Sequence, residues 1–199
     1  TLKAARVALS MHAHEGRTLH FYNADYDRAL AQRQRLEDDL RGALASGQLS
    51  LAYQPLMRVG DGRLLGFEAL LRWTHPAAGP IAPSEFIPLM EELGLIHTVG
   101  EWVLSEACAQ AVRWQRASRS PIEIAVNVSG LQLADPGFAD KVSRALTQSA
   151  LRPQDLVSEL TESVLVSDDD AMAQLVALKA LGLRLALDDF GTGFSSMTS

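Results

Sequence analysis

The second half of the chain alternates short apolar runs with amphipathic stretches, and this alternation restricts the fold more than any other feature. The apolar runs at residues 122–128, 156–161 and 183–187 predict buried strands. The stretches at 135–149 and 167–182 predict the helices between them. Because the connections are short, the strands should form right-handed βαβ units and a parallel sheet.

The first half predicts a hairpin followed by two helices. Strands are expected at 51–57 and 64–73, joined by a turn at Asp61-Gly62, and residues 74–80 are expected to form a loop.

The expected helix boundaries depend on capping residues. Ser84 is a candidate cap for a helix that stops at Gly94 and has Pro88 in its first turn, where a missing amide is tolerated. The pattern Thr98-x-x-Glu101 predicts a capping box that opens a long helix reaching about residue 118. Asp135-Pro136 is expected to cap and start the next helix.

A charged helix is predicted over residues 26–46, with Gly47 as its stop. Leu36, Leu40 and Leu44 recur at every fourth position and form one narrow apolar stripe. A connector, a dimerising helix and a helix packed on its own domain are all compatible with this pattern.

Composition limits the classes of protein that the chain could represent. Its 199 residues are 47% hydrophobic and 21% charged, as in a globular domain with one sizeable core. A net charge of −6 argues against broad binding to DNA or RNA phosphates. With Cys108 as its only cysteine, the chain forms no internal disulfide, and a reducing, cytoplasmic location is expected.

No apolar run approaches the length of a membrane span, so no membrane contact is expected within this segment. The chain begins at Thr1 and ends at Ser199 in a loop-like stretch, and we therefore expect an excerpt of a longer protein.

Acids and an amide stand where the predicted strands end. They are Glu68, Asn127, Glu159 and the pair Asp188-Asp189. In α/β folds, ligands gather at the carboxyl ends of parallel strands. A set of oxygen ligands without clustered cysteine or histidine favours Mg²⁺ or Mn²⁺ over zinc. The number of carboxylates makes a site with two ions for phosphoryl chemistry reasonable, and Arg72 would then hold a phosphate oxygen.

Structural roles for the same residues stay open at this point. Glu68 and Arg72 could form an ordinary ion pair, and Asn127 could bond to the loop that follows it. The two aspartates could simply begin a solvated turn. Glu162, on the opposite strand face from Glu159, is expected to support a loop rather than bind metal.

Several short motifs occur together in one order, and through them the segment from about residue 50 to 196 resembles the EAL family of cyclic di-GMP phosphodiesterases. The matching pieces are Tyr53-Gln-Pro55, Glu68-Ala-Leu-Leu-Arg-Trp73, Pro83-Ser-Glu-Phe-Ile-Pro88, Asn127-Val-Ser129, Glu159-Leu-Thr-Glu162 and Asp188-Asp-Phe-Gly-Thr-Gly193. Each piece alone is a weak signal, whereas the ordered set is specific.

The resemblance implies an α/β fold, a TIM-type (β/α) barrel whose first strand is antiparallel to the others. It also implies hydrolysis of cyclic di-GMP to linear pGpG with two Mg²⁺ or Mn²⁺ ions, and a homodimer formed through the EAL domain. Carried over to this sequence, the ligands of one metal are Glu68, Asn127, Glu159 and Asp188. Asp188 would bridge to a second metal held by Asp189, and these two aspartates with Glu68 form the catalytic set. Gln54 and Arg72 would contact the substrate, and Glu162 would steady the loop at residues 191–196.

The family continues for three more strands, with a lysine and a further metal-binding glutamate that this chain does not contain. Only about the first five strands are therefore expected here. Five strands cannot close a barrel, so we expect a continuation and expect this piece alone to be inactive. A non-catalytic cyclic di-GMP receptor that signals through the linker helix is the alternative.

Residues 1–25 resemble the tail of a GGDEF (diguanylate cyclase) domain, in Ala5-Arg-Val-Ala-Leu9 and Glu15-Gly-Arg17. The predicted organisation is therefore a domain tail at 1–25, a helical linker at 26–47 and the EAL domain at 48–199.

Overall fold

A computed structural model describes residues 24–161 and 169–188 of the chain, with side chains for 31–160 and 170–187. Its contacts divide the chain into a unit of residues 1–41 and a unit of residues 42–199. The charged helix is confirmed as α2 (Ala24–Ala43), which ends three residues earlier than predicted. Gly47 follows it with φ +69°, a left-handed conformation that suits glycine. The domain tail was predicted at residues 1–25, and residues 1–23 lie outside the described part.

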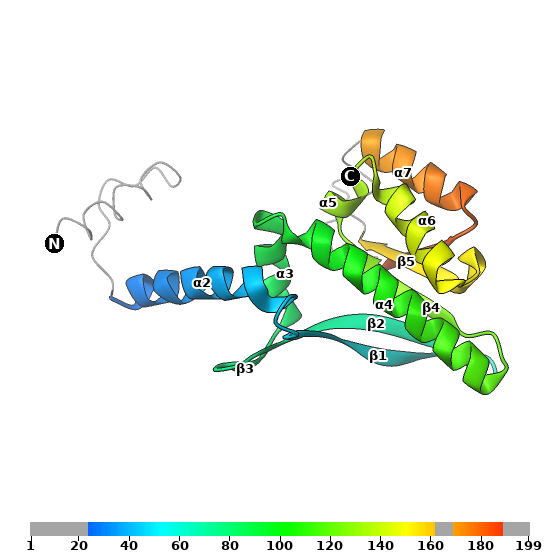
Figure 1. Cartoon of the computed structure of the whole chain (residues 1–199), viewed down its shortest axis with the longest axis horizontal. Coiled ribbons are helices and arrows are strands. Elements are labelled where there is room, and N and C mark those ends of the chain that lie inside the picture. Colours follow the sequence, from blue (N-terminus) through cyan, green and yellow to red (C-terminus); the bar gives the residue numbers. More distant parts are fainter. Residues whose placement is uncertain (1–23, 162–168, 189–199) are drawn as a thin grey trace, which may run out of the picture. The chain divides into compact units, whose positions relative to one another are not determined.

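One sheet organises the second unit (Figure 1). Its strands are β1 (Leu49–Met57), β2 (Leu64–His75), β3 (Gly79–Ile81), β4 (Glu123–Val128), β5 (Leu156–Thr161) and β6 (Arg184–Asp188). They lie in the order β1-β2-β4-β5-β6, with β3 paired to β2. β1 is antiparallel to β2, while the pairs β2–β4, β4–β5 and β5–β6 are all parallel. The predicted barrel-type sheet with an antiparallel first strand is confirmed.

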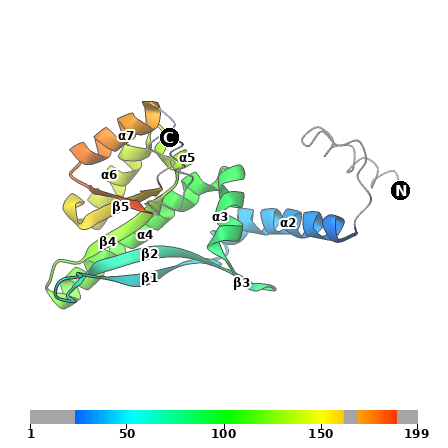
Figure 2. The same cartoon turned by 180° about the vertical axis from the view of Figure 1, so that it is seen from behind.

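The predicted hairpin of β1 and β2 is also confirmed, and Figure 2 shows it as a long twisted ribbon with β3 at one end. Its turn is closed by the amide of Arg58, which donates to the carbonyl of Arg63 over 2.8 Å. Gly62 has φ +66°, which the turn requires.

The expected loop at 74–80 is wrong, because these residues contain a second small hairpin. β2 runs on to His75, and Trp73 pairs with Ile81 of β3. The imidazole Nδ1 of His75 accepts hydrogen bonds from the amides of Ala77 and Ala78, over 3.2 and 3.0 Å. A histidine side chain thus stabilises the turn, a role that composition did not indicate.

Helices α4, α6 and α7 pack side by side along the sheet (Figure 1). The helices of this unit are α3 (Pro83–Glu92), α4 (Leu95–Ser118), α5 (Gly130–Leu133), α6 (Phe138–Ser149), a 3₁₀ turn η1 (Pro153–Asp155) and α7 (Asp169–Ala180). The short helix α5 was not predicted.

The predicted start of α3 is wrong. The cap position is Ala82, without a side-chain hydrogen bond, and Pro83 occupies the first helical position. Proline is preorganised there, since its fixed φ is helical and its missing amide is not needed. Ser84 therefore lies inside the helix, and Pro88 is in the second turn instead of the first.

The predicted starts of α4 and α6 are wrong as well. α4 begins at Leu95, directly after Gly94 with φ +68°, so Thr98 already lies within the helix and caps nothing. α6 begins at Phe138, because Asp135 closes a turn before it. The carboxylate of Asp135 accepts from Lys141 and from the amide of Gly137, each over 2.9 Å, and these bonds lower its pKa.

The central strands β4 and β5 contribute many of the core residues. Ile124, Val126 and Val128 of β4, with Leu156 and Leu160 of β5, are buried. The side chains at these alternate positions point to the face of the sheet that the helices cover, whereas Asn127 and Glu159 occupy positions that point to the other face.

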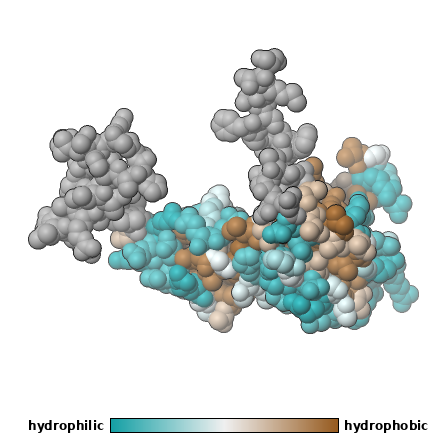
Figure 3. Space-filling view, turned by 90° about the horizontal axis from the view of Figure 1, so that it is seen from above, coloured by the Kyte–Doolittle hydropathy of each residue, from teal (hydrophilic) through white to brown (hydrophobic). Residues whose placement is uncertain are grey.

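The surface mixes hydrophobic and hydrophilic side chains, as the face in Figure 3 shows. Met57, Val59 and Leu64, at the turn end of the β1–β2 hairpin, are exposed large hydrophobic residues. Among the described residues, no helix is both long and apolar enough to cross a membrane.

Substituting Gly66 by alanine should strongly destabilise the fold. A Cβ at this position would overlap the backbone carbonyl of Glu123, at 2.6 Å from its carbon, and this group cannot move without disturbing the β2–β4 pairing. We expect a loss of about 3 kcal/mol in the free energy of unfolding, measured by urea denaturation. Gly60→Ala is the matched control, since its Cβ would meet nothing within 4 Å; equal stability of the two variants would contradict this packing.

Cys108 should be unreactive in the folded protein. It is fully buried, and burial raises its thiol pKa from 9.0 to about 12. Because thiolate is the reactive form, labelling at pH 8 should be slow in buffer and fast in guanidinium. Since the folded pKa is raised, the stability that Cys108 contributes is complete below pH 9 and is lost as the pH rises toward 12. Rapid labelling of the native protein would contradict this burial.

Candidate functional site

Three of the predicted ligands lie on adjacent parallel strands of the sheet: Glu68 on β2, Asn127 on β4 and Glu159 on β5. Asn127 and Glu159 are direct register partners, so their side chains leave the same face of the sheet. Glu68 is the register partner of Ala125, two positions before Asn127. The side chains of Glu68 and Asn127 approach each other across this offset.

A hydrogen bond joins the first two of these residues. The amide Nδ2 of Asn127 donates to Oε1 of Glu68 over 2.8 Å. Bonds to a charged acceptor are among the stronger ones, although Asn127 is exposed and water weakens this one. It fixes the separation of two oxygen-bearing groups from residues 59 positions apart in the chain.

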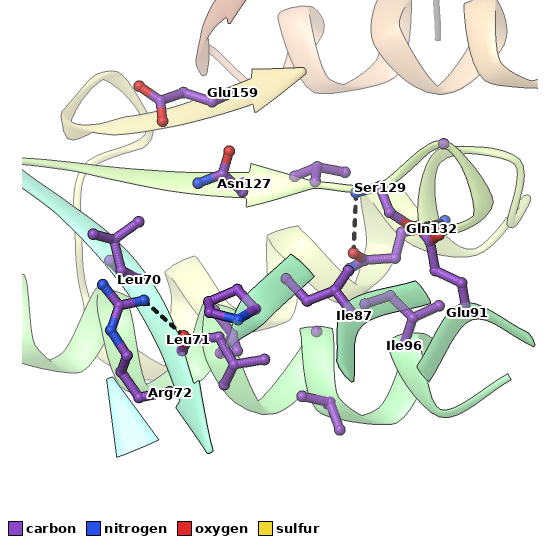
Figure 4. Close-up of a pocket in the computed structure, with 17 residues that line it drawn as sticks. Leu70, Leu71, Arg72, Ile87, Glu91, Ile96, Asn127, Ser129, Gln132 and Glu159 are labelled. Atoms are coloured by element: carbon purple, nitrogen blue, oxygen red, sulfur yellow. Dashed lines mark hydrogen bonds between the residues drawn. The ribbon is translucent and has the colours of Figure 1, made fainter. Parts of the chain in front are cut away.

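Arg72 faces the same region from the end of β2. It lines a cavity of about 530 Å³ together with Leu70, Asn127 and Glu159 (Figure 4). Its Nη1 donates to the carbonyl of Leu71 over 2.9 Å. Among the described residues, Glu68 and Arg72 form no ion pair, so the interpretation of these two side chains as an ordinary ion pair is not supported.

Gln54 lies on β1 as the register partner of Glu68, and it is exposed. Gln54 is therefore on the strand next to that of Glu68, and the strand of Asn127 flanks β2 on its other edge.

The remaining predicted site residues fall at or beyond the limits of the described part. Asp188 is the last residue of β6, where its backbone pairs with Thr161, and its side chain is not described. Asp189 and Glu162 lie outside the described residues.

The described donors fit a hard divalent cation in kind. They are carboxylate and amide oxygens, which Mg²⁺ and Mn²⁺ prefer. A half-turn of the Asn127 carboxamide would present Oδ1 to an ion in place of Nδ2. Within the described ranges, no three carboxylate, histidine or cysteine side chains come together as a metal site. The predicted set includes Asp188 and Asp189, whose side chains are not in those ranges.

Sequence reasoning missed Ser129 and Gln132, which line the cavity beside Asn127. Ser129 caps α5 and accepts from the amide of Gln132, whose Oε1 accepts from the amide of Ser129 (Figure 4). The signal was present, since Ser129-x-x-Gln132 follows the capping-box pattern directly after a strand.

Comparison with known proteins identifies the family to which this arrangement belongs. The sequence model of the EAL domain family matches residues 37–199, so the chain is a member of this family.

Individual relatives agree with this membership. An uncharacterized signaling protein of Caulobacter vibrioides is 45% identical over 197 residues, which is 98% of this chain and 24% of that protein. The bifunctional diguanylate cyclase/cyclic di-GMP phosphodiesterase MucR of Pseudomonas aeruginosa is 45% identical over 178 residues, covering 89% of this chain and 26% of MucR.

A solved structure of the PaMucR phosphodiesterase in a c-di-GMP complex has a TM-score of 0.77 and 47% identity. The match covers 81% of this chain and 66% of that one. The chain thus spans about a quarter of the length of the two curated relatives.

Replacing Asn127 by aspartate should make the stability of the protein depend on divalent cations. The bond of 2.8 Å to Glu68 would become a contact between two carboxylates, which repel each other unless a cation lies between them. We expect a loss of about 1 kcal/mol in stability with chelator present, and a larger rise in Tm on adding Mn²⁺ than in the wild type.

The control for this variant is Gln110→Glu on α4, which adds the same charge away from the cavity. In the wild type the carboxamide oxygen of Gln110 accepts hydrogen bonds from the guanidinium of Arg113, which is exposed on the same helix. If both variants respond equally to Mn²⁺, position 127 does not face a cation site.

Proposed function

We propose that this chain is part of a cyclic di-GMP phosphodiesterase that hydrolyses its substrate to linear pGpG in bacterial second-messenger signalling. The observation that supports it most is the placement of Glu68, Asn127 and Glu159 on three adjacent strands. Asn127 is hydrogen-bonded to Glu68, and Asn127 and Glu159 line a cavity together with Arg72. Support also comes from membership in the EAL domain family and from MucR, whose name includes this activity.

In this proposal the strand-end residues hold the ions and the flanking residues hold the substrate. Glu68, Asn127, Glu159 and Asp188 would hold one Mg²⁺ or Mn²⁺ ion, and Asp188 and Asp189 would hold the second. When bound, the two ions lower the pKa of a water molecule and neutralise charge on the phosphodiester.

Arg72 and Gln54 orient the substrate. The guanidinium of Arg72 leaves its bond to the carbonyl of Leu71 and pairs with phosphate oxygens, for which its planar fork is suited. Gln54 contributes from β1, on the other side of Glu68. Water adds to one phosphorus as the bond from phosphorus to the 3′ oxygen breaks, and that oxygen leaves with a proton. The product is pGpG with a 5′-phosphate.

The surroundings of the domain belong to the same proposal. We place α2 in a linker after a GGDEF-like domain, with Glu162 supporting the loop at 191–196 and the EAL domain forming a homodimer. A cytoplasmic location agrees with a single, buried cysteine.

Substituting Glu68 by glutamine should abolish turnover in the full-length protein. Glutamine keeps the size of the side chain and an acceptor for Asn127, but it removes the negative charge that a cation requires. We expect hydrolysis of cyclic di-GMP with Mg²⁺ or Mn²⁺ to fall by about 100-fold or more, measured as pGpG formed.

The control is Glu106→Gln, which removes an exposed carboxylate of α4 that pairs with Arg113 and does not line the cavity. It should leave turnover unchanged. Nucleotide binding without turnover in the wild-type protein would instead support a non-catalytic receptor, and absence of both would contradict the proposal.

A further inference from the structure

The capping box after β4 is packed against a glycine in a way that couples it to a neighbouring helix. Gln132 is only 5% exposed, and its side chain meets Gly100 of α4. A Cβ at position 100 would overlap Nε2 of Gln132 and lie 2.8 Å from its carboxamide carbon. The contact therefore requires a residue without a side chain at position 100.

The same carboxamide secures the backbone directly after Asn127. Its Oε1 accepts from the amide of Ser129 over 3.2 Å, while the hydroxyl of Ser129 accepts from the amide of Gln132 over 3.4 Å. Ser129 stands two residues after Asn127, where the chain leaves β4 and enters α5. The reciprocal bonds determine the direction of this exit.

We propose that Gly100 and Gln132 are positioning residues for the metal ligand Asn127. Gly100 leaves the space in which the carboxamide of Gln132 lies against α4, and this holds the Ser129 amide and the end of β4 in place. The carboxamide of Asn127 is thereby kept within reach of Glu68. This inference rests on the metal site of the proposed function.

Gly100→Ala tests the inference without weakening α4 itself, because alanine favours a helix over glycine. The new methyl group has to displace the end of the Gln132 side chain, and the bond to the Ser129 amide is then lost. We expect Mn²⁺ affinity in the full-length protein, measured by electron paramagnetic resonance of free Mn²⁺, to fall by about 10-fold. Circular dichroism should be unchanged.

Three further variants separate positioning from general packing. Gln132→Ala should lose a similar amount of affinity, and the double variant Gly100→Ala/Gln132→Ala should lose no more than Gln132→Ala alone, since the clash is gone. Gln132→Glu, which keeps an acceptor for the Ser129 amide, should recover most of the affinity lost in Gln132→Ala. Gly42→Ala is the matched control in a helix, because its Cβ meets nothing within 4 Å.

The outcomes distinguish this inference from the function on which it rests. If wild-type protein binds Mn²⁺ and Gly100→Ala binds it equally well, the positioning role is wrong while the metal site stands. Additive losses in the double variant would also overturn the coupling. If the wild type binds no Mn²⁺, the proposed metal site fails, and the inference fails with it.

Discussion

The close approach of β2 and β4 at Gly66 is the contact on which the rest of this structure depends. The carbonyl of Glu123 lies where any side chain at position 66 would have to be, so the two strands can pair in parallel from the first residue of β4. This pairing joins the antiparallel hairpin to the βαβ part of the sheet. It also sets the register in which Glu68 and Asn127, two residues apart along the strands, come within one hydrogen bond.

From that register the candidate site follows by strand geometry. In β4 and β5 the residues at one set of alternate positions are buried and, except for Ser158, apolar, while the other set includes Asn127 and Glu159. Each of three neighbouring parallel strands contributes one polar residue: Glu68 on β2, Asn127 on β4 and Glu159 on β5. The helices contribute indirectly, because α4 supports α5 through Gly100, and α5 begins where β4 ends.

The sequence predicted the sheet well, because its strands are short apolar runs with period-two polarity and short connections. It predicted helix starts poorly, and the capping boxes show why. Thr98-x-x-Glu101 has the pattern but does not act as a cap, because α4 already begins at Leu95, directly after Gly94. Ser129-x-x-Gln132 has the same pattern and forms both bonds. The two patterns differ in what precedes them: Thr98 lies inside a helix that begins just after Gly94, whereas Ser129 directly follows the end of strand β4. Gln132 also packs against Gly100, a tertiary contact that no local sequence pattern reveals. The turn at His75 depends likewise on a side chain accepting two amides.

The most direct test of this account is a crystal structure of the full-length protein grown with Mn²⁺, with anomalous scattering measured at the manganese edge. If the strand ends form a metal site, a peak should lie about 2.0 to 2.2 Å from oxygens of Glu68 and Asn127, with the Asn127 carboxamide turned so that Oδ1 faces the ion. If the bond from Asn127 to Glu68 persists unchanged with no peak beside it, these residues stabilise the sheet and do not hold a metal.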